Sequence, residues 1–332
     1  MSKTKTAIVT GITGQDGSYL TELLLDKDYK VVGLYRRTSN SNFYRINHLL
    51  DHKNLSLVEF DLTDPSVISN IIKKYQPDEF YNLAAMSHVG SSFHQPTTTF
   101  DINTMGVLHI LEAIRTHHSA TKFYQASTSE MFGKSFDVDE NNNKYQDENT
   151  PLYPQSPYAV SKVASHNLVR IYREAYNIFA TSGILFNHES PRRGENFVTR
   201  KITKYIGQLL NNKTDETLKL GNLQAYRDWG HAKDYVYAMY LMLQQDYPND
   251  FVVCTGKTYQ VIEFLEAAFS SVDLDYKEHV EIDQNLYRPA EVDYLCGRST
   301  KAQKILGWKP LATFDSLVND MVQHDIDIYA HV

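Results

Sequence analysis

The stretch TGITGQDG, residues 10–17, decides how the first part of the chain folds. It follows TAIVT at 6–10, an apolar run typical of a buried strand, and it precedes SYLTELLLDKDY at 18–29, which has helical spacing. Glycines at such a junction allow a tight turn, and the amino terminus of the helix attracts a diphosphate. We therefore predict a dinucleotide-binding turn, although an ordinary glycine-rich turn has the same pattern. Its predicted contacts are Gly11, Thr13, Gly14, Gln15, Asp16 and Gly17.

Strand-like runs continue to alternate with helical segments as far as FATSGILF at 179–186. This alternation predicts an α/β fold of the Rossmann type, with a doubly wound parallel sheet. Beyond about residue 190 the alternation weakens, and no linker rich in Pro, Gly or Ser marks a boundary. We expect a dinucleotide-binding domain at 1–190 and a smaller, interleaved α/β substrate domain formed mostly by 191–332, with segments near 225–250 returning to the first.

The composition predicts a globular protein of a reducing compartment. Of the 332 residues, 42% are hydrophobic and 22% are charged, which suffices for a substantial core. The net charge of −7 disfavours nucleic-acid and membrane partners, which call for a basic surface. The two cysteines, Cys254 and Cys296, form neither a disulfide framework nor a metal-ligand pattern. The amino-terminal residues lack the apolar region of a signal peptide, so we expect a cytoplasmic location.

The end of the second predicted strand concerns the choice of dinucleotide. Arg36 and Arg37 stand in YRRTSN, where an acidic residue would bind a ribose 2′-hydroxyl. Guanidinium groups instead suit a 2′-phosphate, so this pair favours NADP over NAD; two solvated arginines are the alternative. Asp61 follows the third predicted strand, where it either accepts hydrogen bonds from adenine or caps the next helix in DLTDP.

Two further stretches, QASTSE at 125–130 and PQSPYAVSK at 154–162, carry the predicted chemistry. Ser156 and Pro157 suit the start of a helix, which places Tyr158 and Lys162 on one face, one turn apart. A phenol with its pKa lowered from about 10 by a neighbouring ammonium and a nicotinamide is suited to take a proton from an alcohol. The bland alternative is a packed tyrosine beside a solvated lysine.

The motifs TGITGQDG, NLAA at 82–85, Thr128 and YAVSK at 158–162 resemble the extended short-chain dehydrogenase/reductase family. Longer segments are similar to its GDP-mannose 4,6-dehydratase branch, and they extend from about residue 7 to 310. These segments are YRRTS, QASTSEMFG, YPQSPYAVSK, FNHESPRRGENFVTRKI at 186–202, LGNLQAYRDWGHAKDYV at 220–236 and RPAEVD at 288–293.

The resemblance implies an NADP-dependent lyase that converts GDP-D-mannose to GDP-4-dehydro-6-deoxy-D-mannose and water, the first step toward sugars of the GDP-fucose or GDP-rhamnose type. Tyr158, with Lys162 and Thr128, would take the C4 hydroxyl proton as hydride leaves C4. Glu130 would remove the C5 proton and protonate the departing C6 hydroxyl before hydride returns to C6. The alternatives are another nucleotide-sugar 4,6-dehydratase or epimerase, and a noncatalytic NADP-binding scaffold.

The resemblance also implies further contacts. His188 is one of them, although a buried structural histidine is the alternative. A homodimer through the helix of Tyr158 is implied, or a tetramer in which the loop from Arg36 to Ser39 reaches a neighbouring cofactor. The implied cofactor contacts are Arg36, Arg37, Ser39, Asp61, Leu62, Leu83, Ala84, Ala85, Ser87, Tyr158, Lys162, His188 and Arg193. The implied substrate contacts are Ser87, Glu130, Asn187, Lys201, Leu220, Gly221, Arg227, Arg288 and Glu291.

Some features do not match the resemblance or carry no function. The interval from Thr128 to Tyr158 is longer than in the family, with the surplus in the polar, acidic stretch 135–149, which we expect to be a surface loop. Threonines occupy 97–99, where relatives have a tyrosine that contacts the cofactor. His48 and His52 have helical spacing but no further ligand, so we predict no metal site.

Overall fold

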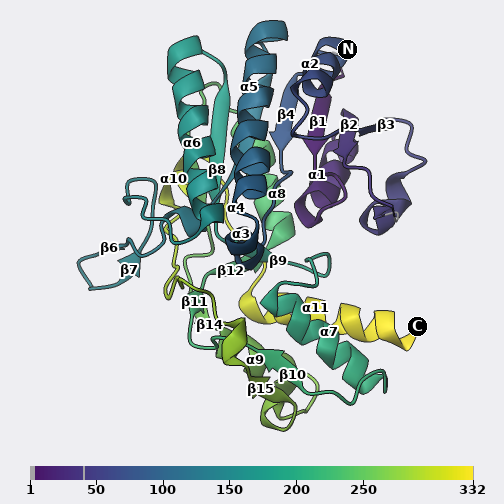
Figure 1. The fold of residues 1–332 in the computed structure, drawn as a ribbon, viewed down its shortest axis with the longest axis vertical. Helices are drawn as coiled ribbons and strands as arrows, with labels where there is room; N and C mark the ends of the chain where they lie inside the picture. Colours follow the sequence, from purple (N-terminus) through teal and green to yellow (C-terminus); the bar gives the residue numbers. More distant parts are fainter. Residues whose placement is uncertain (1–3, 40–41, 332) are drawn as a thin grey trace.

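The computed structural model describes residues 4–39 and 42–331, which form two lobes (Figure 1). The larger lobe contains a parallel sheet of seven strands in the order β13-β8-β5-β4-β1-β2-β3. The order reverses beside β1, as the predicted doubly wound fold requires. The strands are β1 Thr6–Thr10, β2 Lys30–Tyr35, β3 Leu55–Glu59, β4 Glu79–Asn82, β5 Lys122–Thr128, β8 Ala180–Leu185 and β13 Phe251–Val253.

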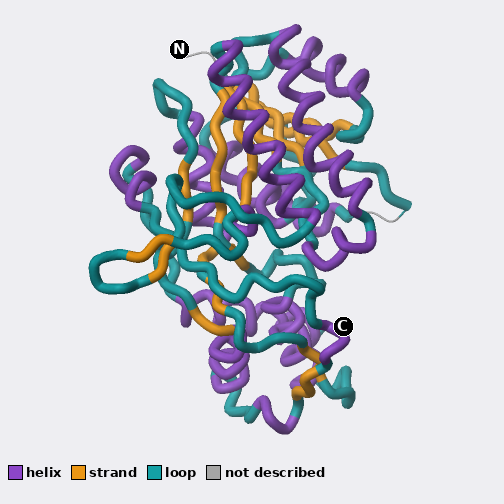
Figure 2. The backbone as a smooth tube through the Cα atoms, turned by 60° about the vertical axis from the view of Figure 1, so that its left-hand side comes forward, coloured by secondary structure: helices purple, strands orange, loops and turns teal. Residues whose placement is uncertain are grey.

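Helices cover both faces of this sheet, which Figure 2 shows nearly edge-on. Ala7 and Val9 of β1 pack on one face in a core with α1 and α8, whereas Ile8 packs on the other with α2, α5 and α6. Burial on both faces explains why the strand reads as a continuous apolar run. The helices of this lobe are α1 Gln15–Asp26, α2 Pro65–Tyr75, α3 Val89–His94, α4 Pro96–Phe100, a π-helix at 101–105, α5 Gly106–His117, α6 Pro157–Tyr176, α8 Ala232–Leu243 and α10 Thr300–Leu306.

The smaller lobe has its own hydrophobic core. Ile206 of α7, Phe264 of α9 and Met321 of α11 are buried together there, with Trp229 at the side facing the sheet. Its strands pair only in twos, β10 with β15 and β11 with β14. The elements are α7 Val198–Leu210, α9 Val261–Ser270, α11 Phe314–Ala330, β10 Leu218–Leu220, β11 Tyr226–Arg227, β14 Tyr259–Gln260 and β15 Val280–Ile282.

Short connections complete the architecture. β9 Asn187–Glu189 and β12 Trp229–His231 pair in parallel where the lobes meet. The acidic stretch 135–149 does not stay irregular: β6 Asp137–Val138 and β7 Lys144–Tyr145 form a hairpin that projects from the molecule (Figures 1 and 2). Within residues 4–39 and 42–331 no helix is both long and apolar enough to cross a bilayer. Short 3₁₀ turns lie at 43–45, 47–49, 129–131, 276–278 and 284–286.

Candidate active site

A cavity of about 750 Å³ lies at the carboxyl ends of β1, β4, β5 and β8, and both lobes line it. This edge of a doubly wound sheet is where such folds bind ligands. Nearly every residue that the sequence predicted for the site lines this cavity. From the larger lobe these are Gly11, Thr13, Gly14, Gln15, Asp16, Gly17, Arg36, Asp61, Leu62, Leu83, Ala84, Ala85, Ser87, Thr128, Glu130, Tyr158 and Lys162; from later segments they are Asn187, His188, Arg193, Lys201, Leu220, Gly221, Arg227, Arg288 and Glu291.

Two predicted cofactor contacts lie outside this cavity. Arg37 instead lines a small adjoining pocket with Arg36, Asp61 and Asp64. Ser39 is exposed and lines neither pocket.

The glycine-rich turn has the geometry that a diphosphate needs. Gly11 adopts a φ of +66°, which favours glycine, and its carbonyl accepts a hydrogen bond of 2.9 Å from the N–H of Gly14. A Cβ atom at Gly17 would lie 2.3 Å from the carbonyl oxygen of Gly11. Gly14 begins α1, and no side chain caps this end of the helix. Its free N–H groups therefore suit an anionic ligand.

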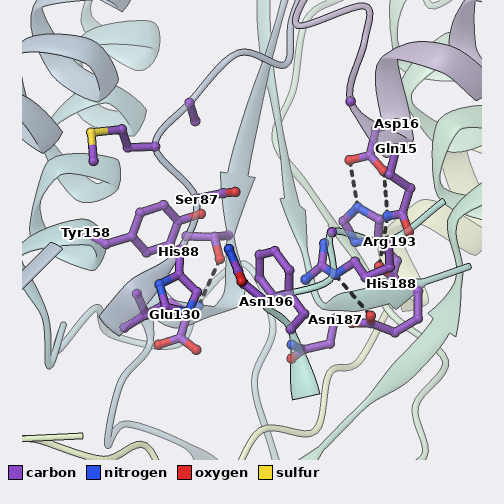
Figure 3. Close-up of a pocket in the computed structure, with 18 of the residues that line it drawn as sticks. Gln15, Asp16, Ser87, His88, Glu130, Tyr158, Asn187, His188, Arg193 and Asn196 are labelled. Carbon is purple, nitrogen blue, oxygen red and sulfur yellow. Dashed lines mark hydrogen bonds and ion pairs between the residues drawn. The ribbon is translucent and has the colours of Figure 1, made fainter. Parts of the chain in front are cut away.

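Asp16 and His188, both predicted cofactor contacts, form an ion pair with each other. Figure 3 shows Nε2 of His188 facing the Asp16 carboxylate, at 2.8 Å. Nδ1 of the same ring lies 2.8 Å from the carbonyl oxygen of Phe186, so both ring nitrogens face acceptors. Burial is the largest effect and lowers the pKa of His188, but the charge of Asp16 and its hydrogen bond together outweigh burial and raise the pKa. The histidine is therefore a buried ion-pair partner of Asp16 at the edge of the cavity.

Tyr158 and Lys162 occupy the start of α6, as predicted. The Ser156 hydroxyl caps the helix by accepting the N–H of Ala159 at 3.0 Å. Lys162 Nζ donates to the carbonyl oxygen of Ala126 at 2.9 Å and lies 5.9 Å from the centre of the Tyr158 ring.

The pKa of the Tyr158 phenol is raised in the chain without cofactor. Burial raises it to about 12, and this outweighs the opposite effect of the hydrogen bond with the Thr128 hydroxyl. Burial also lowers the pKa of Lys162 to about 8. The lowering of the phenol pKa by ammonium and nicotinamide together stays a prediction.

Glu130 joins the predicted catalytic residues to the smaller lobe. Its N–H donates to the Thr128 hydroxyl at 3.3 Å, and its carboxylate lies 3.5 Å from Nη1 of Arg288. Arg288 also approaches Glu291, at 3.6 Å, and Arg227 donates to Glu291 at 3.1 Å. A chain of alternating charges therefore links the end of β5 with the segment 288–291, which no helix or strand includes.

Comparisons with known proteins agree with this geometry. The family model described as "GDP-mannose 4,6 dehydratase" matches residues 8–321. The chain belongs to the GDP-mannose 4,6-dehydratase family. It is 52% identical to "GDP-mannose 4,6 dehydratase 2" of Arabidopsis thaliana, over 98% of this chain and 87% of that protein.

Solved structures similar to this member of the GDP-mannose 4,6-dehydratase family support the fold assignment. A dTDP-glucose 4,6-dehydratase from Bacillus anthracis in complex with NAD has a TM-score of 0.83 at 21% identity, with 96% of each chain covered. The RMD of Pseudomonas aeruginosa complexed with NADPH has a TM-score of 0.78 at 22% identity, covering 98% of this chain and 100% of that one. At such identities the likeness concerns the fold alone.

Sequence reasoning missed several residues that line the cavity of this family member. His88 follows the predicted contact Ser87 directly, and that adjacency was the one signal that could have identified it. Arg45 donates hydrogen bonds to the carbonyl oxygens of Thr13 and Arg192, so it lies beside the glycine-rich turn. Lys219, Asn196 and Asn222 add further polar groups. The spacing of motifs could not reveal these residues, because only folding brings them to the cavity.

Two alternatives that the sequence left open are decided by the structure. Asp64, and not Asp61, caps α2 by accepting the N–H groups of Ser66 and Val67, while Asp61 accepts from Thr63. The helix-cap interpretation of Asp61 is therefore wrong. His48 pairs with Glu22 at 2.6 Å, and among residues 4–39 and 42–331 no cluster of His, Cys, Asp and Glu side chains is arranged to hold a metal ion.

Proposed function

We propose that the protein converts GDP-D-mannose to GDP-4-dehydro-6-deoxy-D-mannose and water. The observation that carries this proposal is the presence of Glu130 and Tyr158 in one cavity, because an alcohol oxidation alone does not need a carboxyl acid/base group beside the tyrosine. Membership of the GDP-mannose 4,6-dehydratase family supports the same substrate. The product retains the nucleotide and is a precursor of 6-deoxyhexoses.

The cofactor of this reaction is a nicotinamide dinucleotide, and we propose NADP. The turn from Gly11 to Gly17 suits the diphosphate, and the exposed Arg36 and Arg37 beside the small pocket suit a 2′-phosphate. A bound nicotinamide would supply the redox chemistry, since the hydride taken from C4 would return to C6 while C5 regains a proton.

Tyr158 takes the proton of the C4 hydroxyl, and Thr128 holds the same oxygen. Ionising a phenol whose pKa is about 12 near neutral pH takes roughly 7 kcal/mol of phenolate stabilisation. Lys162, charged at neutral pH, contributes part of it, and the positive charge of the oxidised nicotinamide contributes more. Tyr158 would therefore act as a base only when the cofactor is bound, because the phenol stays protonated at neutral pH in the free chain.

Glu130 performs the elimination: it removes the C5 proton and gives a proton to the departing C6 hydroxyl. The Glu130 side chain is 11% exposed, so little bulk water competes for the proton. Arg193, Lys201, Arg227 and Arg288 line the same cavity and supply positive charge for the GDP diphosphate in a chain whose net charge is −7.

Mass spectrometry of the purified protein with GDP-mannose and a catalytic amount of NADP⁺ tests the proposal, with dTDP-glucose and UDP-glucose in parallel. We expect loss of one water from GDP-mannose alone, without accumulation of NADPH. Conversion of another sugar nucleotide, with GDP-mannose untouched, would overturn the substrate. Epimerised product without loss of water would overturn the reaction.

The variant Glu130→Gln separates binding from elimination. The amide keeps the size of the carboxyl group but cannot accept the C5 proton, so we expect loss of product by at least about 100-fold with both ligands still bound. Near-normal release of water by this variant would refute the role of Glu130. Glu140→Gln, an exposed carboxylate on the hairpin, is the matched control.

We also propose that two copies pair along α6. Val160 and Ile171 lie on one face of this helix and are 42% and 45% exposed, which is unusual for apolar side chains of this size. Light scattering of Ile171→Glu tests the pairing: we expect a monomer where the native chain forms a dimer. A native monomer would contradict it, and a tetramer would require a second contact, for which the loop from Arg36 to Ser39 is the candidate.

A further inference from the structure

His88 lies just before α3, and its hydrogen bonds determine where its proton sits. Nδ1 accepts the N–H of Ser91 at 3.2 Å and lies 2.8 Å from the Ser91 hydroxyl. A backbone N–H can only donate, so Nδ1 carries no proton and the neutral ring has its proton on Nε2. The ring is therefore oriented as a donor at its outer edge.

The position of the ring directs this donor into the cavity. Phe197 packs against it edge to face, with ring centres 5.9 Å apart. Among the described residues, no group forms a hydrogen bond with Nε2. His88, Ser87, Glu130 and Tyr158 all line this cavity (Figure 3), and Arg288, one of the cations that act on the ring, lies 3.5 Å from Glu130.

The surroundings of His88 lower its pKa. Partial burial is the main cause, and the cations Arg288, Lys201 and Arg193 lower the pKa further. They approach from the segment after the last 3₁₀ turn, from α7 and from the loop before α7, and Arg193 is itself paired with Glu189 at 3.0 Å. On its own helix the ring bonds Ser91 and lies over Gly90, where an added Cβ would be 3.1 Å from Cε1 of His88. Arg288 connects this region with Glu130, whose carboxylate is 3.5 Å away from it.

We propose that His88 is a substrate-binding residue whose Nε2–H donates a hydrogen bond to a hydroxyl of the hexose, at the end where Glu130 acts. This inference rests on the proposed function. The diphosphate is the less suitable acceptor, because four cations already line the cavity to meet it and a neutral donor adds little there. Near Arg288, which lies 3.5 Å from Glu130, a neutral donor orients a hydroxyl without adding another positive charge.

Two amide variants separate the two nitrogens of His88. In His88→Asn the side-chain oxygen can still accept the Ser91 N–H, and Asn is a favourable helix cap, but the outer donor is lost. In His88→Gln the amide N–H reaches close to the position of Nε2. We expect kcat/KM for GDP-mannose to fall about 10-fold to 30-fold in the Asn variant and to recover most of that loss in the Gln variant.

Calorimetry of the NADP-loaded protein with GDP and with GDP-mannose distinguishes a hexose contact from other roles. For His88→Asn we expect unchanged affinity for GDP, weaker binding of GDP-mannose and an unchanged midpoint of thermal unfolding. His94→Asn, at the far end of α3 and outside the cavity, is the matched control and should behave as the native protein does.

Each other outcome overturns the inference. Equal weakening of GDP and GDP-mannose would move the contact to the diphosphate. A lower unfolding midpoint with no selective loss of GDP-mannose binding would reduce His88 to a helix cap. Native turnover by His88→Asn would remove the inference while leaving the proposed function intact, whereas a native protein inert toward GDP-mannose would overturn both.

Discussion

The two sides of the cavity are built in different ways. On the sheet side, Thr128 ends β5, and Tyr158 and Lys162 lie in the first turns of α6, so the backbone of regular elements holds them. On the other side, Arg288 and Glu291 lie outside any helix or strand and are held by ion pairs to each other and to Glu130. The groups proposed to move protons are thus held rigidly, and those proposed to recognise charge can exchange partners when a ligand arrives.

The residues on the sheet side of the cavity are also more deeply buried than those on the loop side. Tyr158 and Lys162 are 7% and 3% exposed, and their pKa values lie about 12 and about 8, each shifted toward the neutral form. Arg288 keeps 32% of its side chain exposed. At neutral pH the buried charge of Lys162 therefore costs stability on the sheet side, whereas Arg288 on the loop side keeps contact with solvent.

The largest effect is expected from Tyr158→Phe, which removes the proposed base without changing the packing of the ring. We expect kcat to fall about 1,000-fold while KM for GDP-mannose changes little, because the phenol acts on the reacting proton. Steady-state kinetics measures both constants. Tyr153→Phe, an exposed tyrosine just before α6, is the control. A change in KM alone would contradict the proposal that the sheet side moves protons and the loop side recognises the substrate.

The cost of burying charge on the sheet side can be measured with Lys162→Met. Below pH 8 the lysine is charged in both folded and unfolded chains, so replacing it should raise the free energy of unfolding by up to about 3 kcal/mol. The pKa of about 8 in the folded chain and 10.5 in the unfolded one mean that this gain shrinks as the pH rises between those values.

Denaturant titrations of Lys162→Met without ligands, at pH 7 and pH 10.5, measure this gain, and turnover should be lost. Lys53→Met, at an exposed position, should show neither effect. A variant less stable than the native chain at pH 7 would mean that the hydrogen bond to Ala126 outweighs the buried charge.

On the loop side, Arg288→Met should weaken recognition more than chemistry. Removing one charged contact to the diphosphate is expected to raise KM for GDP-mannose about 10-fold, with kcat within about threefold of the native value. Arg298→Met, which breaks a surface pair with Asp139 on the hairpin, serves as control. A fall in kcat with an unchanged KM would place Arg288 among the groups that act on Glu130 during elimination.

The smallest effect is expected from replacing the exposed arginines Arg36 and Arg37, whose charges are surrounded by solvent. Replacing Arg36 and Arg37 by serine should reduce the preference for NADP⁺ over NAD⁺ by about 10-fold, since each exposed guanidinium contributes a modest charged hydrogen bond. Equilibrium binding of the two cofactors gives the ratio, with Arg115→Ser as control. An unchanged ratio would identify the pair as solvated arginines, and single variants would show whether Arg37 contributes from its separate pocket.

Much of the larger lobe follows from local patterns. The strands of the seven-stranded sheet up to β8 and the helices α1, α2, α5 and α6 were predicted because each has a clear period and clear end signals. β13 was missed, since three residues are too few for a periodic signal and its pairing with β8 is a long-range event. The hairpin at 137–145 was missed for the opposite reason: its polar residues favour a loop, and the pairing is local but short.

The sequence by itself determined the features that depend on neighbours in the chain. These are the glycine-rich turn, the start of α6 at Ser156 and the placing of Tyr158 and Lys162 on one helical face. Only the tertiary structure decided the ion pair of His188 with Asp16, the raised pKa of Tyr158 and the free donor of His88. A pKa and a tautomer depend on burial and on charges brought from distant segments, and the order of residues does not record those distances.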